Sequence, residues 1–227
     1  MRLGCGGTEG ERPLNYRGVI FDMDGTLVDS FRAIHGSLME AMKKVGLPPW
    51  DLEKTTQHVG RGIGYLVESA VGTGRKEEAL AFFRQDYGET CLGRTVLLPS
   101  VSETLPRLRA AGLRLAVATN KSLVFTQRIL SHLDVYRYFE CVLGPEAVAR
   151  PKPHPDMIHA ILDRLELTET ECLYVGDMPL DVETASQAGV DCLLVATGPY
   201  AYPVLKREVA VPVVKGFADI PRFLKME

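Results

Sequence analysis

The chain has 227 residues, of which 46% are hydrophobic, and this length suits one full α/β domain with a smaller second unit. Its 26 basic and 29 acidic residues leave a formal net charge of −3. Proteins that rely on nucleic-acid phosphates for affinity are usually strongly basic, so we expect no nucleic-acid partner.

The five cysteines are scattered and form no Cys-x-x-Cys pair, which argues against a disulfide framework or a structural zinc site. No run of the sequence approaches the roughly 20 apolar residues that a membrane helix needs. Residues 1–15 are rich in glycine and charge without an apolar segment, which predicts a disordered leader and not a secretory signal. We therefore expect a soluble cytoplasmic protein without a membrane partner, either a monomer or a homodimer.

From Tyr16 onward, short apolar runs alternate with amphipathic segments. The expected strands, each of consecutive apolar residues, are Val19–Phe21, Leu113–Ala118, Phe139–Leu143, Cys172–Val175 and Cys192–Ala196. The expected helices between them are Val101–Ala111, Leu123–Leu133, Asp156–Leu165 and Leu180–Ala188. Capping-box patterns occur at Ser100–Glu103 and Thr168–Glu171, and Gly112 and Gly189 stand where helices should end. This alternation predicts a doubly wound, Rossmann-like parallel sheet.

Residues 30–98 interrupt this alternation, because they contain helical patterns and no convincing strand. The helical stretches are Ile34–Val45, Leu66–Val71 and Glu77–Leu92. Such a block is too long for an ordinary strand-to-helix crossover. We predict a small helical domain over residues 30–98, inserted into a core formed by residues 16–29 and 99–227.

A pair of carboxylates follows the first expected strand. Asp22 and Asp24 are two positions apart, which on an extended backbone points both side chains to one side. In open α/β sheets ligands bind at the carboxyl ends of the strands, and a carboxylate pair there suits magnesium binding, nucleophilic attack and proton transfer. A calcium loop is disfavoured, because the sixth position is Leu27 where such loops need glycine.

Polar residues also follow three later expected strands. Thr119 and Asn120 follow the second, and Lys152 lies in the proline-rich loop Arg150–Pro155 after the third. Asp177 and Asp181 follow the fourth and are four positions apart, on one face of a helix start. Each feature alone is ordinary, since caps and solvated lysines are common. Their succession at consecutive strand ends predicts one phosphate-binding and metal-binding site.

With these four motifs in order, the chain resembles the haloacid dehalogenase-like superfamily of phosphohydrolases, over Tyr16 to about Pro199. Within it, Thr119-Asn120-Lys121, Lys152-Pro153-His154-Pro155, Val175-Gly176-Asp177 and Val59-Gly60-Arg61-Gly62 resemble the phosphoglycolate phosphatase branch. The resemblance implies a magnesium-dependent phosphatase that acts on a small phosphorylated metabolite, with residues 30–98 as a cap domain.

The resemblance also implies a role for each motif residue. Asp22 would be the nucleophile that forms an aspartyl-phosphate, and Asp24 the acid and base. Thr119 would hydrogen-bond the phosphoryl group, Asn120 beside it would also bind substrate, and Lys152 would neutralise charge between nucleophile and phosphate. Mg²⁺ would be bound by Asp22, Asp177 and the backbone carbonyl of Asp24, with Asp181 behind these ligands.

Two basic residues have weaker assignments, because solvated basic side chains are common. Arg61 lies in a glycine-rich turn between two helices of the insert, where it either faces solvent or binds a substrate carboxylate in the cleft. Lys121 follows the Thr119-Asn120 pair, and a contact with substrate is open for it as well.

Several alternative functions remain open at this point. A signalling receiver domain also uses an acidic pair, a Thr and a Lys, although receivers have no long insert after the first strand. A sugar-phosphate phosphatase, a mutase or a pyrophosphatase could use the same scaffold, and a binding protein with a decayed site is a further reading. The motifs do not choose the physiological substrate.

Overall fold

A computed structural model of the chain describes residues 16–226, so the predicted leader at residues 1–15 lies outside the described part. Six parallel strands form one sheet in the order β5-β4-β1-β6-β7-β8. In chain order these strands are β1 (Gly18–Phe21), β4 (Arg114–Ala118), β5 (Cys141–Leu143), β6 (Cys172–Gly176), β7 (Asp191–Val195) and β8 (Val213–Val214). The order reverses beside β1, which places the topological switch point between β1 and β6.

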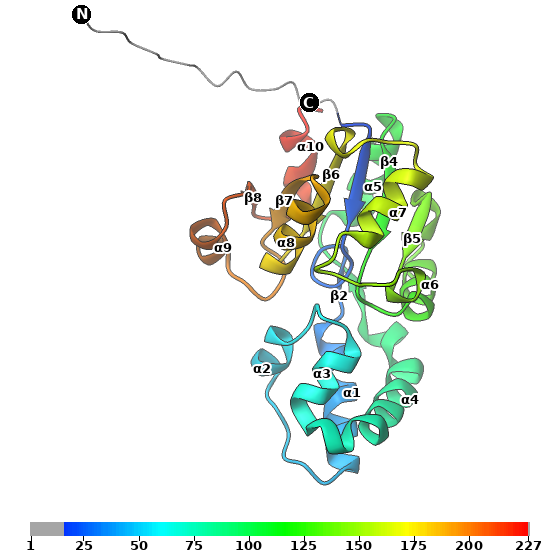
Figure 1. Cartoon of the computed structure of the whole chain (residues 1–227), viewed down its shortest axis with the longest axis vertical. Helices are drawn as coiled ribbons and strands as arrows, with labels where there is room; N and C mark the ends of the chain where they lie inside the picture. The colour runs from blue at the N-terminus through cyan, green and yellow to red at the C-terminus, as the bar shows by residue number, and fades with distance from the viewer. Residues whose placement is uncertain (1–15, 227) are drawn as a thin grey trace, which may run out of the picture.

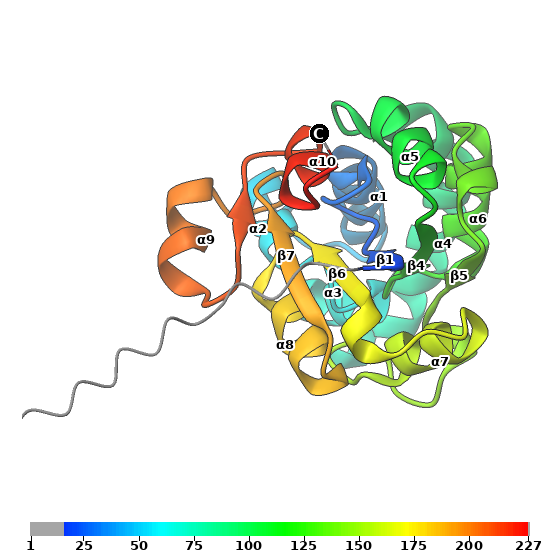
Figure 2. The same ribbon diagram turned by 90° about the horizontal axis from the view of Figure 1, so that it is seen from above.

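Helices cover both faces of this sheet (Figures 1 and 2). They are α5 (Val101–Ala110), α6 (Leu123–His132), α7 (Asp156–Arg164), α8 (Pro179–Ala188), α9 (Tyr202–Glu208) and α10 (Ile220–Phe223). Side chains alternate along β1: Val19 and Phe21 join the apolar cluster that includes α5, α6 and α10, whereas Ile20 joins the cluster with α7 and α8. Burial on both faces explains the continuous apolar strands and confirms the doubly wound fold.

Four helices lie together beyond the end of the sheet toward which β1 points (Figure 1). They are α1 (Phe31–Lys44), α2 (Leu52–Gln57), α3 (Ile63–Val71) and α4 (Lys76–Arg94). Where the chain leaves the sheet for these helices and returns, β2 (Val28–Asp29) pairs antiparallel with β3 (Val96–Leu97). The insert is therefore joined to the core by two adjacent strands directly beside the end of β1.

Some local expectations were wrong. The segment 30–98 does contain a strand, since β3 lies within it; with only two residues it is too short to show a periodic pattern. The residues of α2 were also not recognised as a helix. At α5, Ser100 is in the left-handed region at φ 67° and its side chain makes no capping bond. The capping box at Thr168 is present, but it begins a 3₁₀ turn and not an α-helix.

Other expected boundaries hold to within a few residues. Gly189 ends α8 at φ 71°, the left-handed conformation that glycine adopts without a steric penalty. Within residues 16–226, no helix combines the length and the apolar sequence that crossing a lipid bilayer would require.

The insert is stabilised by a buried apolar interior, and Phe83 of α4 is a sharp test of it. This ring is fully buried and stacks on Tyr87 with 5.4 Å between ring centroids. We expect Phe83→Ala to lower the free energy of unfolding by about 3–5 kcal/mol, because it leaves a cavity. Val124→Ala, at a side chain that is 62% exposed, is the control and should change it by less than about 0.5 kcal/mol. Equal denaturant midpoints for the two variants would contradict this packing.

Candidate active site

All the buried charged side chains of residues 16–226 belong to one site. They are Asp22, Asp24, Lys121, Lys152, Asp177 and Asp181. Four carboxylates and two ammonium groups leave two formal negative charges in a buried place. Buried charge is stable only when it is paired or bound to a metal ion, so this imbalance points to a cation.

The ends of parallel strands bring these groups together. Asp22 directly follows β1, and its backbone N–H donates to the carbonyl of Val175 in β6 at 2.9 Å. Asp177 directly follows β6, and Thr119 directly follows β4. The two aspartates thus lie at the switch point, where the diverging connections of an open sheet leave room for a ligand.

Lys152 connects two of the carboxylates. Its Nζ lies 2.9 Å from Oδ1 of Asp22 and 2.8 Å from Oδ1 of Asp181, and it donates to the hydroxyl of Tyr174 at 3.0 Å. Burial lowers the pKa of this ammonium, but the two aspartates outweigh burial and raise its pKa above the usual value. Lys152 is therefore a fixed positive charge beside Asp22, although lysines in proline-rich loops are commonly solvated.

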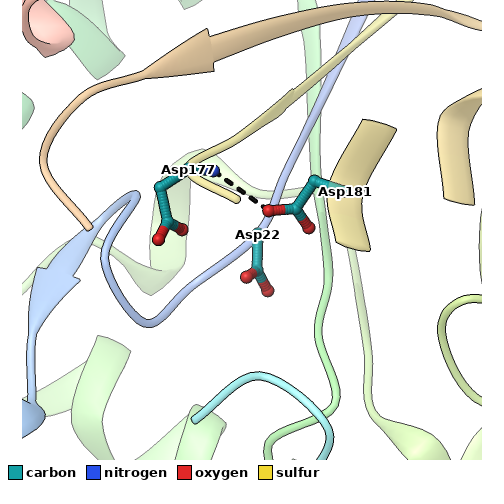
Figure 3. Close-up of side chains that lie close together, drawn as sticks. All are labelled: Asp22, Asp177 and Asp181. Atoms are coloured by element: carbon teal, nitrogen blue, oxygen red, sulfur yellow. Dashed lines mark hydrogen bonds between the residues drawn. The ribbon is translucent and has the colours of Figure 1, made fainter. Parts of the chain in front are cut away.

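Asp22, Asp177 and Asp181 each offer a carboxylate oxygen within 4.8 Å of the others (Figure 3). Asp181 already has a full set of partners, because Oδ1 faces Lys152 and Oδ2 accepts the backbone N–H groups of Asp177 and Met178. Oδ1 of Asp177 accepts a hydrogen bond from Thr26 at 2.8 Å. Asp181 thus positions its neighbours.

The buried Oδ2 of Asp177 has no hydrogen-bond partner within residues 16–226, and the buried Oδ1 of Asp22 faces only the ammonium of Lys152, 2.9 Å away. Burial raises the pKa of Asp22 to about 6, although Lys152 opposes this shift, and burial also raises the pKa of Asp177, with Asp181 adding to it. A cation bound between these oxygens would favour their ionised forms. Hard oxygen donors with excess negative charge fit Mg²⁺.

Asp24 has a different environment from Asp22. Its Oδ1 accepts a hydrogen bond from Ser30 at 2.5 Å and one from Lys121 at 3.0 Å, and Nζ of Lys121 is 3.2 Å from Oδ2. Lys121 also lies over the ring of Tyr87 in α4, 4.8 Å from its centroid. The general expectation of a solvated side chain was wrong for Lys121, whose side chain is only 4% exposed.

Thr119 and Asn120 are both buried, and they have different surroundings. The hydroxyl of Thr119 accepts the backbone N–H of Lys121 at 3.2 Å and lies in the wall of the cavity that contains Asp22 and Asp24. The amide of Asn120 donates to the carbonyls of Gly60 and Lys152 and accepts the N–H of Lys152, all at 2.9 Å. The side chain of Asn120 therefore connects the turn of the insert to the Lys152 loop, and these protein contacts engage the amide that we expected to bind substrate.

The structure does not bring the Arg61 side chain to the aspartates. The turn between α2 and α3 does face the core, since Gly60 and Gly62 line the same cavity as Asp22. Arg61 itself is exposed and lies over the ring of Tyr65, 5.6 Å from the centroid. Of the two readings that the sequence left open, the turn borders the cavity as the second requires, while its arginine is exposed as the first requires and lines neighbouring surface hollows.

Sequence reasoning missed several supporting residues. Ser30 and Thr26 hydrogen-bond Asp24 and Asp177, and Tyr174 holds Lys152. Gly198 was also missed: a Cβ there would lie 1.8 Å from Oδ2 of Asp177. A hydroxyl residue next to an acidic motif is only a weak sequence signal of a role at the site. The contact of Gly198 has no local signal, because it depends on the path of the chain after β7.

The chain is similar to known proteins over most of its length. Residues 19–195 match the haloacid dehalogenase-like hydrolase family. The chain is 34% identical over 199 residues to a phosphoglycolate phosphatase of Salmonella paratyphi A, a match that covers 77% of this chain and 79% of the relative. A phosphoglycolate phosphatase of Escherichia coli K12 is 33% identical over 197 residues, covering 76% and 78% of the two chains.

Solved structures share the fold. The crystal structure of a predicted phosphoglycolate phosphatase from Haemophilus somnus 129PT superposes with a TM-score of 0.85 at 29% identity. The superposition covers 92% of this chain and 98% of that chain. The likeness therefore extends over the helical insert as well as the sheet.

The crowding at Gly198 predicts a metal-affinity defect. We expect Gly198→Ala to displace the carboxylate of Asp177 and to weaken Mg²⁺ binding by roughly 10- to 100-fold, the range for residues that orient metal ligands. Titration calorimetry on the metal-free protein measures this. Gly216→Ala is the control, because a Cβ there meets nothing within 4 Å. Equal Mg²⁺ affinities for both variants would show that Gly198 has no role at the site.

Proposed function

The chain belongs to the haloacid dehalogenase-like hydrolase family, and from that premise we propose that it is a magnesium-dependent phosphatase that hydrolyses small phosphate monoesters. The observation that carries the proposal is the difference between the surroundings of two buried aspartates, Asp22 and Asp24. Asp22 lies 2.9 Å from the ammonium of Lys152 and offers a carboxylate oxygen within 4.8 Å of Asp177 and Asp181, whereas Asp24 stands outside that group with both oxygens facing Lys121. The first carboxylate is placed to attack phosphorus beside a metal ion, and the second is held for proton transfer.

Mg²⁺ would be held by the carboxylates of Asp22 and Asp177 and by the backbone carbonyl of Asp24. When bound, it supplies positive charge to the phosphoryl oxygens during transfer. Two formal negative charges in the site and the unpartnered Oδ2 of Asp177 support this assignment. Asp181 supports the ligands through its contacts with Lys152 and with the start of α8.

Asp22 is the nucleophile in this proposal. Its carboxylate oxygen forms a bond to phosphorus as the bond from phosphorus to the leaving oxygen breaks, which gives an aspartyl-phosphate. Lys152, 2.9 Å from Asp22, neutralises charge between the carboxylate and the phosphoryl oxygens. Thr119, in the wall of the same cavity, donates its hydroxyl to the phosphoryl group.

Asp24 is the acid and base. It gives its proton to the oxygen of the leaving alcohol, and the resulting carboxylate then takes a proton from the water that attacks the aspartyl-phosphate. Inorganic phosphate leaves, and both aspartates return to their starting states. Ser30 and Lys121 orient the Asp24 carboxyl group.

Residues 30–98 act as a cap over a core of residues 16–29 and 99–227. The contact between Asn120 and the Gly60 carbonyl supports this role, because it seats the turn of the insert on the catalytic loops. Seating the cap excludes bulk water from the aspartyl-phosphate. The names of the relatives favour phosphoglycolate as substrate. A cytoplasmic location remains a prediction.

The proposal is tested by metal removal and substrate hydrolysis. We expect the purified protein to release phosphate from 2-phosphoglycolate, to lose this activity after EDTA treatment and dialysis, and to regain it with Mg²⁺. Phosphate release is the measurement, and untreated protein is the control. Full activity of the stripped protein would contradict the metal assignment, and failure to hydrolyse any small phosphate monoester would contradict the function.

Replacement of Asp24 should depend on the leaving group. We expect Asp24→Asn to slow hydrolysis of 2-phosphoglycolate by about 10²–10⁴-fold, because the alkoxide leaves poorly without a proton. For p-nitrophenyl phosphate, whose leaving group is already a stable anion, the loss should be much smaller. Steady-state kcat/KM on both substrates measures this difference, and equal losses would rule out the acid role.

A further inference from the structure

A small cavity between the sheet and the helical insert has two unlike sides. On the core side it is lined by Asp22, Asp24 and the Thr119-Asn120-Lys121 loop. On the insert side its walls are mainly apolar, with Ile34, Val59, Ile63 and Leu66. A leaving group bound beside Asp24 would therefore meet hydrocarbon on the cap side and polar groups on the core side.

Lys121 is the one cation among the described residues that line this cavity. Its ammonium carries three N–H donors, and its two contacts to Asp24 go to a single carboxyl group. Its remaining surroundings include the face of the Tyr87 ring, and the side chain is only 4% exposed. A buried ammonium in an apolar setting interacts strongly with an anion that displaces water from beside it.

The position of Lys121 follows the reaction geometry. A general acid must lie within hydrogen-bond distance of the leaving oxygen, so that oxygen sits beside the carboxyl group of Asp24. Nζ of Lys121 is 3.0 Å from Oδ1 of Asp24. Atoms two or three bonds beyond the leaving oxygen therefore come close to Lys121. The cation of Arg61, exposed above Tyr65 and absent from the lining of this cavity, does not share that position.

We propose that Lys121 forms an anion subsite for the leaving group and makes the enzyme selective for short phosphate monoesters whose alcohol carries a carboxylate. The inference rests on the proposed phosphatase function and adds a specificity residue to it. The substrate carboxylate accepts a hydrogen bond from Nζ of Lys121 while its leaving oxygen accepts the proton of Asp24. The apolar side chains of the cap wall contact the methylene.

A merely structural Lys121 would hold Asp24 and nothing else. It would then support all substrates equally, whatever the charge of their leaving groups. The two roles are separated by a pair of substrates of nearly equal size, 2-phosphoglycolate and its carboxamide analogue, in which a neutral amide replaces the carboxylate. The ratio of their kcat/KM values reports on the charge of the leaving group alone.

In the wild-type protein we expect this ratio to favour the carboxylate by roughly 10- to 100-fold, the range of a charge-assisted hydrogen bond. This measurement needs no variant. Equal kcat/KM values for the two compounds would overturn the subsite while leaving the phosphatase function intact. If neither compound nor p-nitrophenyl phosphate is hydrolysed, the proposed function fails and the subsite fails with it.

Variants then assign the subsite to one residue. Lys121→Met should bring the ratio close to one, even if it also lowers kcat through Asp24, and Lys121→Arg should retain a preference for the carboxylate. Lys44→Met, at an exposed cation of the insert, controls for loss of one positive charge and should keep the wild-type ratio. Collapse of the ratio in Arg61→Met with a normal ratio in Lys121→Met would overturn the proposal in favour of Arg61.

Discussion

The ammonium of Lys152 lies between the carboxylates of Asp22 and Asp181, 2.9 and 2.8 Å from the nearest oxygen of each, and the remainder of the site is arranged around it. Asp22 follows β1, Asp181 lies in the first turn of α8, and Lys152 comes from the loop after β5. Removing this one ammonium would leave two buried carboxylates unpaired, at a cost of several kcal/mol. The strand order β5-β4-β1-β6 is what lets these segments meet.

The surroundings of Lys152 explain why chemistry is possible in so buried a place. The oxygens of Asp181 accept hydrogen bonds from Lys152 and from backbone N–H groups. Asp181 therefore holds Lys152 and the start of α8 in place, and its oxygens are already engaged by the protein. Asp177 keeps an oxygen, Oδ2, without a hydrogen-bond partner within residues 16–226, and Asp22 has the single ammonium of Lys152 beside it. Asp24 is held apart by Lys121 and Ser30. Carboxylates of one chemical type thus acquire different capacities through their neighbours alone.

The sheet and the meeting of the aspartates at its edge could be predicted from sequence because their signals are local and repeated. Buried parallel strands are continuous apolar runs, and the polar residues that follow them must meet at one edge. The contacts of Asn120 with Gly60 and of Gly198 with Asp177 could not be predicted from sequence, because each contact joins segments that are far apart in the chain. The burial of Lys121 and the exposure of Arg61 depend on how the insert packs against the core. The sequence next to either residue does not determine that packing.

The covalent intermediate on Asp22 is the central claim, and direct trapping tests it. The protein is mixed with 2-phosphoglycolate and Mg²⁺, quenched in acid within the first turnovers, and digested for peptide mass spectrometry, with Asp22→Asn as the control. We predict one added phosphoryl group on the peptide that contains Asp22, sensitive to hydroxylamine as an acyl phosphate is, and none in the variant. Turnover without any phosphoryl-peptide, or a phosphoryl group on another residue, would contradict the account.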